Sequence, residues 1–166
     1  MTKHHGLTLR PDLAQAAAEG RKLMTRRPEK EGKPCPYAVG DLIWWRELWA
    51  ADLAYDRTPP SSLPPDADLW WGVGRANTPQ RGKDRPANHM PKRLARTWAR
   101  VVRVRRERVQ QISAADARAE GCPVGAPDPR SWFAGVWSDC HGVDAWESSP
   151  WVDAIALEPC ERPDGL

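Results

Sequence analysis

A proline-rich stretch at residues 58–88 limits the fold of this chain more than any other feature. Six prolines fall within it, together with several glycines and charged residues, so it cannot form regular secondary structure throughout. An internal stretch of this length is either a functional loop, such as a lid or a binding loop, or disordered. We therefore expect one domain over residues 1–166, with an inserted loop at about residues 58–88 that Trp70 and Trp71 anchor to the rest.

Short apolar segments on either side of the insertion predict a sheet. Alternation or β-branching favours four strands, at residues 6–10, 42–45, 97–105 and 151–157. At residues 97–105 a helix is the alternative, because Leu94, Trp98 and Val101 would share one helical face. Residues 49–55 are expected to form either a short helix or an irregular extension.

Two helices carry terminal signals. Pro11 suits a first helical turn, the alanine-rich residues 13–19 continue it, and Gly20 is expected to end it in the left-handed conformation. Ser113, with an aspartate three residues later, predicts the start of a helix within residues 112–121. A shorter helical turn is expected at residues 132–137.

This order of elements indicates a fold class. The strands are separated by short helices and lack the regular spacing of βαβ units. The sequence therefore predicts an α+β fold with a mostly antiparallel sheet closed into a barrel and flanked by short helices.

The cysteines and histidines give no sign of a metal site. The four cysteines are far apart and form no C-x-x-C pair, so we interpret them as reduced thiols and expect neither a metal nor another cofactor. No segment has the length and apolar character of a membrane span, and the polar residues 1–7 do not resemble a signal peptide. These features predict a cytoplasmic protein without a membrane partner.

Tryptophan content and charge distribution both allow two interpretations. Ten tryptophans stand against one phenylalanine, either as large core side chains or as flat faces on which nucleobases stack. Residues 92–108 contain eight basic residues and one acid, whereas residues 111–166 contain ten acids and three arginines. The basic run is either an anion-binding surface or a solvated strand face paired with the acidic part of the chain.

Four segments, in order, resemble a known family. Residues 20–27 (GRKLMTRR) are similar to the G-x-K-x-x-[E/T]-x-R signature of ASCH domains, a branch of the PUA-like β-barrels. Residues 40–47 (GDLIWWRE) resemble a strand of phage- or prophage-encoded ASCH-like proteins. The two further matches lie at residues 88–93 with 103–121, and at residues 145–152. If the chain is phage-encoded, its place of action is the host cytoplasm.

The resemblance implies a fold used to recognise RNA or modified nucleosides. One small branch hydrolyses N4-acetylcytidine with a Thr-Lys-Glu set, and the motif positions correspond here to Thr25, Lys22 and Glu120. The resemblance thus implies a metal-independent amidohydrolase, in which Thr25 attacks, Lys22 takes the proton and Glu120 orients or relays it.

The same three residues also have ordinary structural interpretations. Lys22 could pair with an acid, Thr25 suits any strand, and a glutamate near a helix end is common. Side chains alternate along an ideal strand, so Lys22 and Thr25 would point to opposite faces. The catalytic interpretation therefore requires the chain to bend or bulge after Gly20.

Further residues are predicted to bind the ligand. They are Arg27 and Arg26, whose planar guanidinium groups suit phosphate or carbonyl oxygens, together with Trp45, Glu47 and Arg93. For Glu47, a structural pair with an arginine is the alternative.

Three hypotheses about function follow. The first is the amidohydrolase, acting on a nucleoside. The second is a non-catalytic module that binds single-stranded RNA or DNA through the same cleft and the basic run. The third is a phage accessory protein that acts by protein–protein contact, with Trp70 and Trp71 as hot spots.

Overall fold

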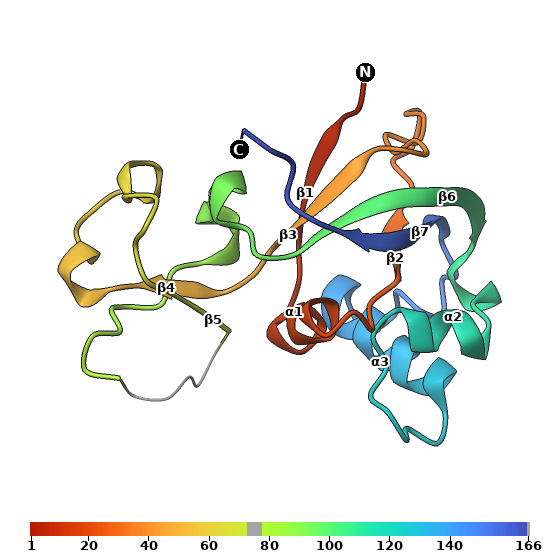
Figure 1. Ribbon diagram of the computed structural model, residues 1–166. Helices are drawn as coiled ribbons and strands as arrows, with labels where there is room; N and C mark the ends of the chain where they lie inside the picture. The colour runs from red at the N-terminus through yellow and green to blue at the C-terminus, as the bar shows by residue number, and fades with distance from the viewer. Residues whose placement is uncertain (73–77, 166) are drawn as a thin grey trace.

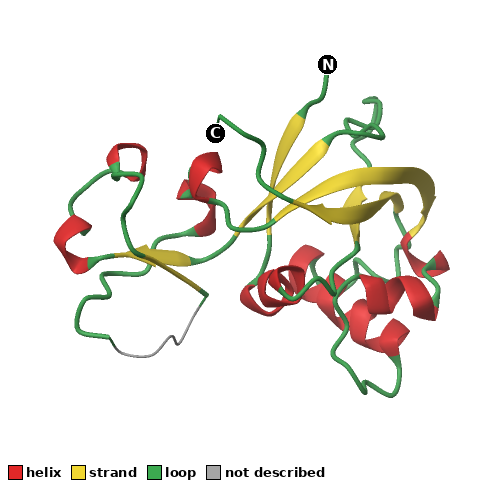
Figure 2. Ribbon diagram, in the orientation of Figure 1, coloured by secondary structure: helices red, strands yellow, loops and turns green. Residues whose placement is uncertain are grey.

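The computed structural model describes residues 1–72 and 78–165 and shows a mixed α+β fold (Figure 1). A five-stranded sheet has the order β1-β3-β6-β7-β2. Its strands are β1 (His4–Thr8), β2 (Met24–Pro28), β3 (Leu42–Arg46), β6 (Trp98–Arg108) and β7 (Trp151–Cys160). The helices are α1 (Pro11–Ala18), α2 (Ala114–Ala119) and α3 (Pro129–His141), which gather below the sheet on the side of β2 (Figure 2).

The sheet is mostly antiparallel, as predicted. Only β1 and β3 run parallel, and the long strands β6 and β7 pair along their whole length with one bulge between Val101 and Arg103. The predicted closed barrel is not formed within the described residues, because the hydrogen-bonded ladder ends at β1 on one side and at β2 on the other. The helix α1 connects these two strands and packs on the core.

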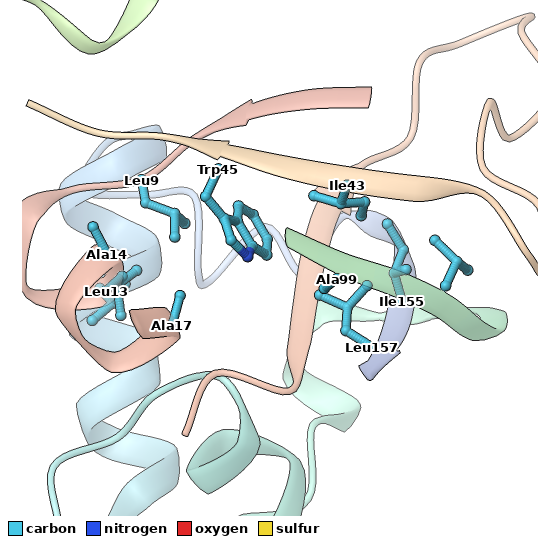
Figure 3. Close-up of a cluster of buried hydrophobic side chains, with 11 residues drawn as sticks. Leu9, Leu13, Ala14, Ala17, Ile43, Trp45, Ala99, Ile155 and Leu157 are labelled. Carbon is cyan, nitrogen blue, oxygen red and sulfur yellow. The ribbon is translucent and has the colours of Figure 1, made fainter. Parts of the chain in front are cut away.

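The core of the sheet joins α1 to four strands. Leu13, Ala14 and Ala17 of α1 lie on one side of the Trp45 indole, and side chains of β6 and β7 such as Ile155 lie on the other (Figure 3). Buried apolar area of this kind stabilises the fold by roughly 25 cal/mol per Å². Trp45 is 1% exposed, so packing is the correct interpretation for this tryptophan.

A side lobe, residues 49–72 and 78–96, extends from the sheet at the left of Figure 1. It contains the two-stranded sheet of β4 (Trp49–Ala51) and β5 (Leu69–Trp71) and four short 3₁₀ turns, Leu53–Tyr55, Pro60–Ser62, Ala87–His89 and Lys92–Leu94. A second apolar cluster holds it to the sheet, and Trp71 packs against that cluster.

Three local predictions need correction. Residues 49–55 form a strand followed by a 3₁₀ turn, because Trp49 and Ala51 pair with β5 in the proline-rich stretch. That stretch is therefore not one loop: it supplies a strand and two turns to the side lobe, while residues 73–77 lie outside the described residues. The short turn predicted at residues 132–137 belongs to the 13-residue helix α3, which Asp128 caps.

The other predicted elements are confirmed, with shifts of a few residues at their ends. Strands occupy the four predicted segments, and a strand, not a helix, follows Thr97. The helix α1 begins at Pro11, and Gly20 has φ +72°. None of the helices in the described part of the chain has the length and apolar character that crossing a bilayer requires.

Candidate functional site

A cavity of about 230 Å³ lies where β2 meets the helices. The connection between β1 and α1 forms one wall and α3 forms the opposite one. The residues that line it are Thr8, Leu9, Arg10, Leu13, Lys22, Thr25, Arg26, Arg27, Glu120, Phe133, Val136, Trp137, Cys140 and His141. Its lining includes buried polar side chains, three of them charged: Lys22, Arg26 and Glu120, like the uncharged Thr25, are at most 4% exposed. Buried charges of this kind need partners close by.

The end of α1 places Lys22 and Thr25 in the same cavity. Gly20 turns the chain with φ +72°, and the backbone N–H of Lys22 donates to the Ala16 carbonyl at 3.2 Å. β2 begins only at Met24, so Lys22 precedes the strand and strand alternation does not apply to it. The bend that the catalytic interpretation requires after Gly20 is therefore present.

The last turn of α2 places Glu120. The Ser113 hydroxyl accepts from the Asp116 N–H at 3.0 Å and starts the helix, as predicted. Gly121 follows Glu120 with φ +104°, and a Cβ there would lie 3.0 Å from the Cβ of Ala16. Only glycine suits this conformation and this close approach, which brings the end of α2 against α1.

Lys22 and Glu120 form the centre of a buried charge network. Lys22 Nζ donates to Glu120 Oε2 at 2.9 Å, to the Glu120 carbonyl at 2.9 Å and to the Met24 carbonyl at 3.0 Å. Arg26 Nη1 donates to the other carboxylate oxygen, Oε1, at 3.0 Å. Burial lowers the pKa of Lys22, and the Glu120 carboxylate opposes part of that shift.

Besides Glu120, two more carboxylates neutralise the Arg26 guanidinium. It donates to Glu107 at 2.7 and 2.9 Å and to Asp116 at 2.9 Å, and both of these acids also pair with Arg105. Burial opposes ionisation of Asp116, but hydrogen bonds from Arg105 and Arg26 hold the pKa of that carboxyl below its usual value. Arg26 lines the cavity, but its guanidinium is engaged by three carboxylates, and its predicted ligand role stays a prediction.

Arg27 differs from its neighbour because no carboxylate of the described residues pairs with it. Its Nε atom is buried without a hydrogen-bond partner, and burial lowers the pKa of the guanidinium. Burial and the Arg27 charge together lower the pKa of His141 at the mouth of the cavity. The cavity thus offers a cation to a ligand, which suits an anionic group or a carbonyl oxygen.

Three of the predicted ligand residues do not line the cavity. Trp45 belongs to the core, although its ring centroid lies 6.0 Å from Lys22 Nζ. Glu47 is 1% exposed and accepts two hydrogen bonds from Arg96, both at 2.9 Å, so it forms the alternative structural pair. Arg93 donates to the Leu63 and Pro60 carbonyls of the side lobe at 2.8 and 3.2 Å.

Sequence reasoning missed the wall that α3 contributes. Phe133, Trp137, Cys140 and His141 come from a helix that was predicted as one short turn. The available signal was Asp128 followed by Pro129, a capping residue with a proline at the first helical position. Within the described part of the chain, no three His, Cys, Asp or Glu side chains cluster as a metal site would require.

Comparison with solved structures reveals the same fold in other proteins. The ASCH domain from Lactobacillus crispatus JV V101 is 12% identical over 95% of this chain and 79% of that chain, with a TM-score of 0.52. The hypothetical protein PH0355 is 12% identical over 95% of this chain and 99% of that chain, with a TM-score of 0.50. Protein EF3133 from Enterococcus faecalis V583 is also 12% identical, over 89% of this chain, with a TM-score of 0.49, and this chain spans 66% of its length.

The sequence comparisons add no relative. No protein-family model matches the chain, and no curated protein matches it either. The likeness to the first two structures therefore concerns the fold. This chain has the fold of an ASCH domain.

Proposed function

We propose that this protein binds a modified nucleobase in the cavity beside β2 and hydrolyses an amide on it. One observation supports the proposal above the others: Lys22, Thr25 and Glu120 come from three different segments and line the same cavity. The resemblance of residues 20–27 to the ASCH signature relates the set to the small N4-acetylcytidine amidohydrolases. An N4-acylcytidine is therefore the substrate class that we propose.

The chemistry requires each of the three residues in a defined role. The Thr25 oxygen attacks the amide carbonyl carbon, and its proton passes to the neutral amine of Lys22. The C–N bond then breaks, and Lys22 returns the proton to the leaving exocyclic nitrogen. Water hydrolyses the Thr25 ester and releases the carboxylic acid. Glu120 holds Lys22 in place through the 2.9 Å contact with Oε2.

Arg27 and the aromatic wall would orient the substrate. The unpaired guanidinium suits the negative charge that develops on the carbonyl oxygen during attack. Phe133 and Trp137 of α3 give an apolar side to the cavity, against which a nucleobase can lie. No step of this scheme uses a metal or an organic cofactor.

Substitution of the nucleophile tests the proposal. Thr25→Val keeps the side-chain volume and removes the hydroxyl, so hydrolysis of a panel of N4-acylated cytidines, followed by chromatography, should fall at least 100-fold (roughly the contribution of one catalytic group). Thr97→Val, the same change outside the cavity, is the matched control and should keep full turnover. Wild-type protein that hydrolyses no member of the panel contradicts the proposal, as does a Thr25→Val variant with unchanged turnover.

A non-catalytic nucleic-acid-binding module is the second candidate, and the exposed arginines of β6 favour it. The strand register places Arg100 and Arg103 on one face of the strand and Arg106 and Arg108 on the other. The latter two lie over the Trp151 ring at 3.8 and 4.3 Å. Exposed arginines of this kind can contact a phosphate backbone. A phage accessory protein that acts by protein–protein contact is the third candidate, although Trp71 packs against the apolar cluster between the side lobe and the sheet.

A further inference from the structure

A second cavity, of about 320 Å³, lies on the other side of Arg27. The segment that follows β2 folds over it, so that Pro28, Pro34, Pro36 and the Tyr37 ring form apolar walls. Arg27, which is half-buried, and the buried Asp153 are the polar groups inside it, while Lys30 and Lys33 are exposed at the rim. None of the three candidate functions uses this cavity.

Asp153 is the polar residue that needs an explanation. It is 6% exposed, and the strand register places it opposite Arg27 of β2 and opposite Arg106 of β6. Neither arginine forms an ion pair with it. Arg106 instead pairs with Glu29, at 2.8 and 2.9 Å, and lies over Trp151.

The Asp153 carboxylate therefore lacks a strong donor. Among the described residues, no backbone N–H and no charged side chain donates a hydrogen bond to its oxygens. The Cys35 thiol is only a weak donor to it: burial raises the pKa of that thiol, and the hydrogen bond with Asp153 and the charge of its carboxylate raise it further. Because almost all buried carboxylates accept good hydrogen bonds, a donor from outside the chain is the expected partner.

Arg27 connects this cavity to the first one. Its side chain lines both of them, and its Nε is one of the buried donors that have no acceptor among the described residues. A ligand whose reacting group occupies the first cavity can thus extend past Arg27 into the second. There it meets one acceptor, Asp153, one donor, Arg27, and an apolar surface made by prolines and Tyr37.

We propose that the second cavity is the sugar subsite of the nucleoside whose base lies in the first cavity. A ribose fits each feature. Its vicinal hydroxyls can donate to Asp153 and accept from Arg27, and its C–H face can pack on the Tyr37 ring. A phosphate fits less well, because it would lie against the buried carboxylate. This inference rests on the proposed function, which supplies the ligand.

Binding measurements with a sugar series test the subsite. The probes are N4-acetylcytidine, its 2′,3′-dideoxy analogue and the free base N4-acetylcytosine, titrated into the full chain carrying Thr25→Val so that no turnover interferes. The ribonucleoside should bind about tenfold or more tightly than the dideoxy analogue, because hydrogen bonds to a charged group are lost. Equal affinity for the two nucleosides overturns the proposal.

Two variants and one control variant make the test specific to the cavity. Asp153→Asn should remove the preference for ribose while leaving the affinity of the dideoxy analogue within about twofold, and Glu158→Gln, an exposed change on the same strand, should leave the preference intact. Tyr37→Leu should weaken both nucleosides but not the free base. A retained preference in Asp153→Asn, or equal loss for all three probes in Tyr37→Leu, overturns the subsite.

The outcomes separate the subsite from the proposed reaction. If the wild-type protein hydrolyses the substrate but binds both nucleosides equally, the sugar subsite is wrong and the hydrolase proposal stands. If ribose preference is present without turnover, the subsite stands and the hydrolase proposal is wrong. Failure of every nucleoside and of the free base to bind overturns both.

Discussion

The side lobe and the sheet region that holds the cavity both bury charged residues, but they neutralise them differently. In the side lobe, Arg85 donates to the carbonyls of Thr58 and Tyr55 at 3.0 and 2.6 Å and lies over the Trp49 ring. Nearby, Arg96 holds Glu47 through two hydrogen bonds. The Nε of Arg85, like that of Arg27, is buried without a partner, but the other contacts of these charged groups are made within the protein itself.

The sheet region leaves some of its polar groups available. Lys22, Glu120 and Arg26 are occupied, but Arg27 has no carboxylate partner within the described residues, and Thr25 lies beside it in the same cavity. The comparison shows that a buried charge alone does not mark a site. A cavity-lining guanidinium that makes no hydrogen bond to the described residues, as at Arg27, is the better indicator.

The largest expected effect is a loss of stability when the buried guanidinium of Arg26 is removed from the sheet region. Arg26→Met leaves Glu107, Asp116 and Glu120 with one cation fewer in a buried setting, so we expect the free energy of unfolding to fall by about 3–5 kcal/mol. Urea denaturation followed by tryptophan fluorescence measures it. A loss below about 1 kcal/mol would mean that the remaining cations, Lys22 and Arg105, neutralise the cluster by themselves.

The corresponding change at the base of the side lobe, at Glu47, should cost less stability and leave the cavity intact. Glu47→Gln weakens the contact with Arg96, whose side chain is 29% exposed and can turn to water. We expect a loss of about 1–3 kcal/mol in the free energy of unfolding and unchanged nucleoside affinity, checked by denaturation and titration. Weaker nucleoside binding in this variant would show that the two regions are coupled.

The pH dependence of turnover should also distinguish the regions. Lys22 must be neutral to accept a proton, so the rate should rise about tenfold per pH unit and level off at the lowered pKa of Lys22, below its ordinary value of 10.5. Because Glu120 raises the pKa of Lys22, Glu120→Gln should move any remaining activity to lower pH. Glu47→Gln should leave the profile unchanged. A rate that falls as pH rises contradicts the role of Lys22 as base.

The free energy of unfolding should also depend on pH through the titration of Lys22. The pKa of Lys22 is lower in the folded state than in the unfolded chain, so the unfolded state binds more protons between the two values. Its contribution therefore makes the protein more stable as pH rises through that window. Lys22→Met should remove this part of the pH dependence, measured by denaturation over a pH series.

The smallest expected effect is on the salt dependence of nucleic-acid binding, and it compares an arginine of β6 with one of the side lobe. Arg103 is exposed, so if this face binds single-stranded RNA, Arg103→Gln should make the slope of log affinity against log salt shallower by about 0.7. Arg93 is held by backbone carbonyls, so Arg93→Gln should leave the slope unchanged. Equal slopes for the wild type and the Arg103 variant would remove β6 from the nucleic-acid interface.

Much of the fold follows from local patterns. Ser113 and Gly121 mark the ends of α2 by capping and by positive φ, which depend on neighbouring residues alone. Residues 49–55 were less predictable because their strand exists only through pairing with β5, about twenty residues later. Barrel closure also depends on distant strands, and no local pattern reports that the ladder ends at β1 and β2.

The site was predictable only in part, because some of its residues are brought together by contacts between distant segments. Lys22, Thr25 and Glu120 were singled out by their resemblance to a family signature, and the turn at Gly20 explains how the first two line one cavity. Trp45 was a candidate for base stacking, but its position in the sheet buries it. Asp153 carried no signal, since its cavity arises where the segment after β2 folds over a distant strand.

The pairing of β2 with β7 suggests how the length of the chain can change during evolution. Thr25 lies opposite Ile155 and Arg27 opposite Asp153. Insertion or deletion of a single residue between Gly20 and Met24 would displace Lys22 or, if it shifted this register, exchange the two faces of β2. Homologous chains should therefore keep this short connection at constant length, whereas the turns of the side lobe, which bear on no register in the main sheet, can lengthen or shorten freely.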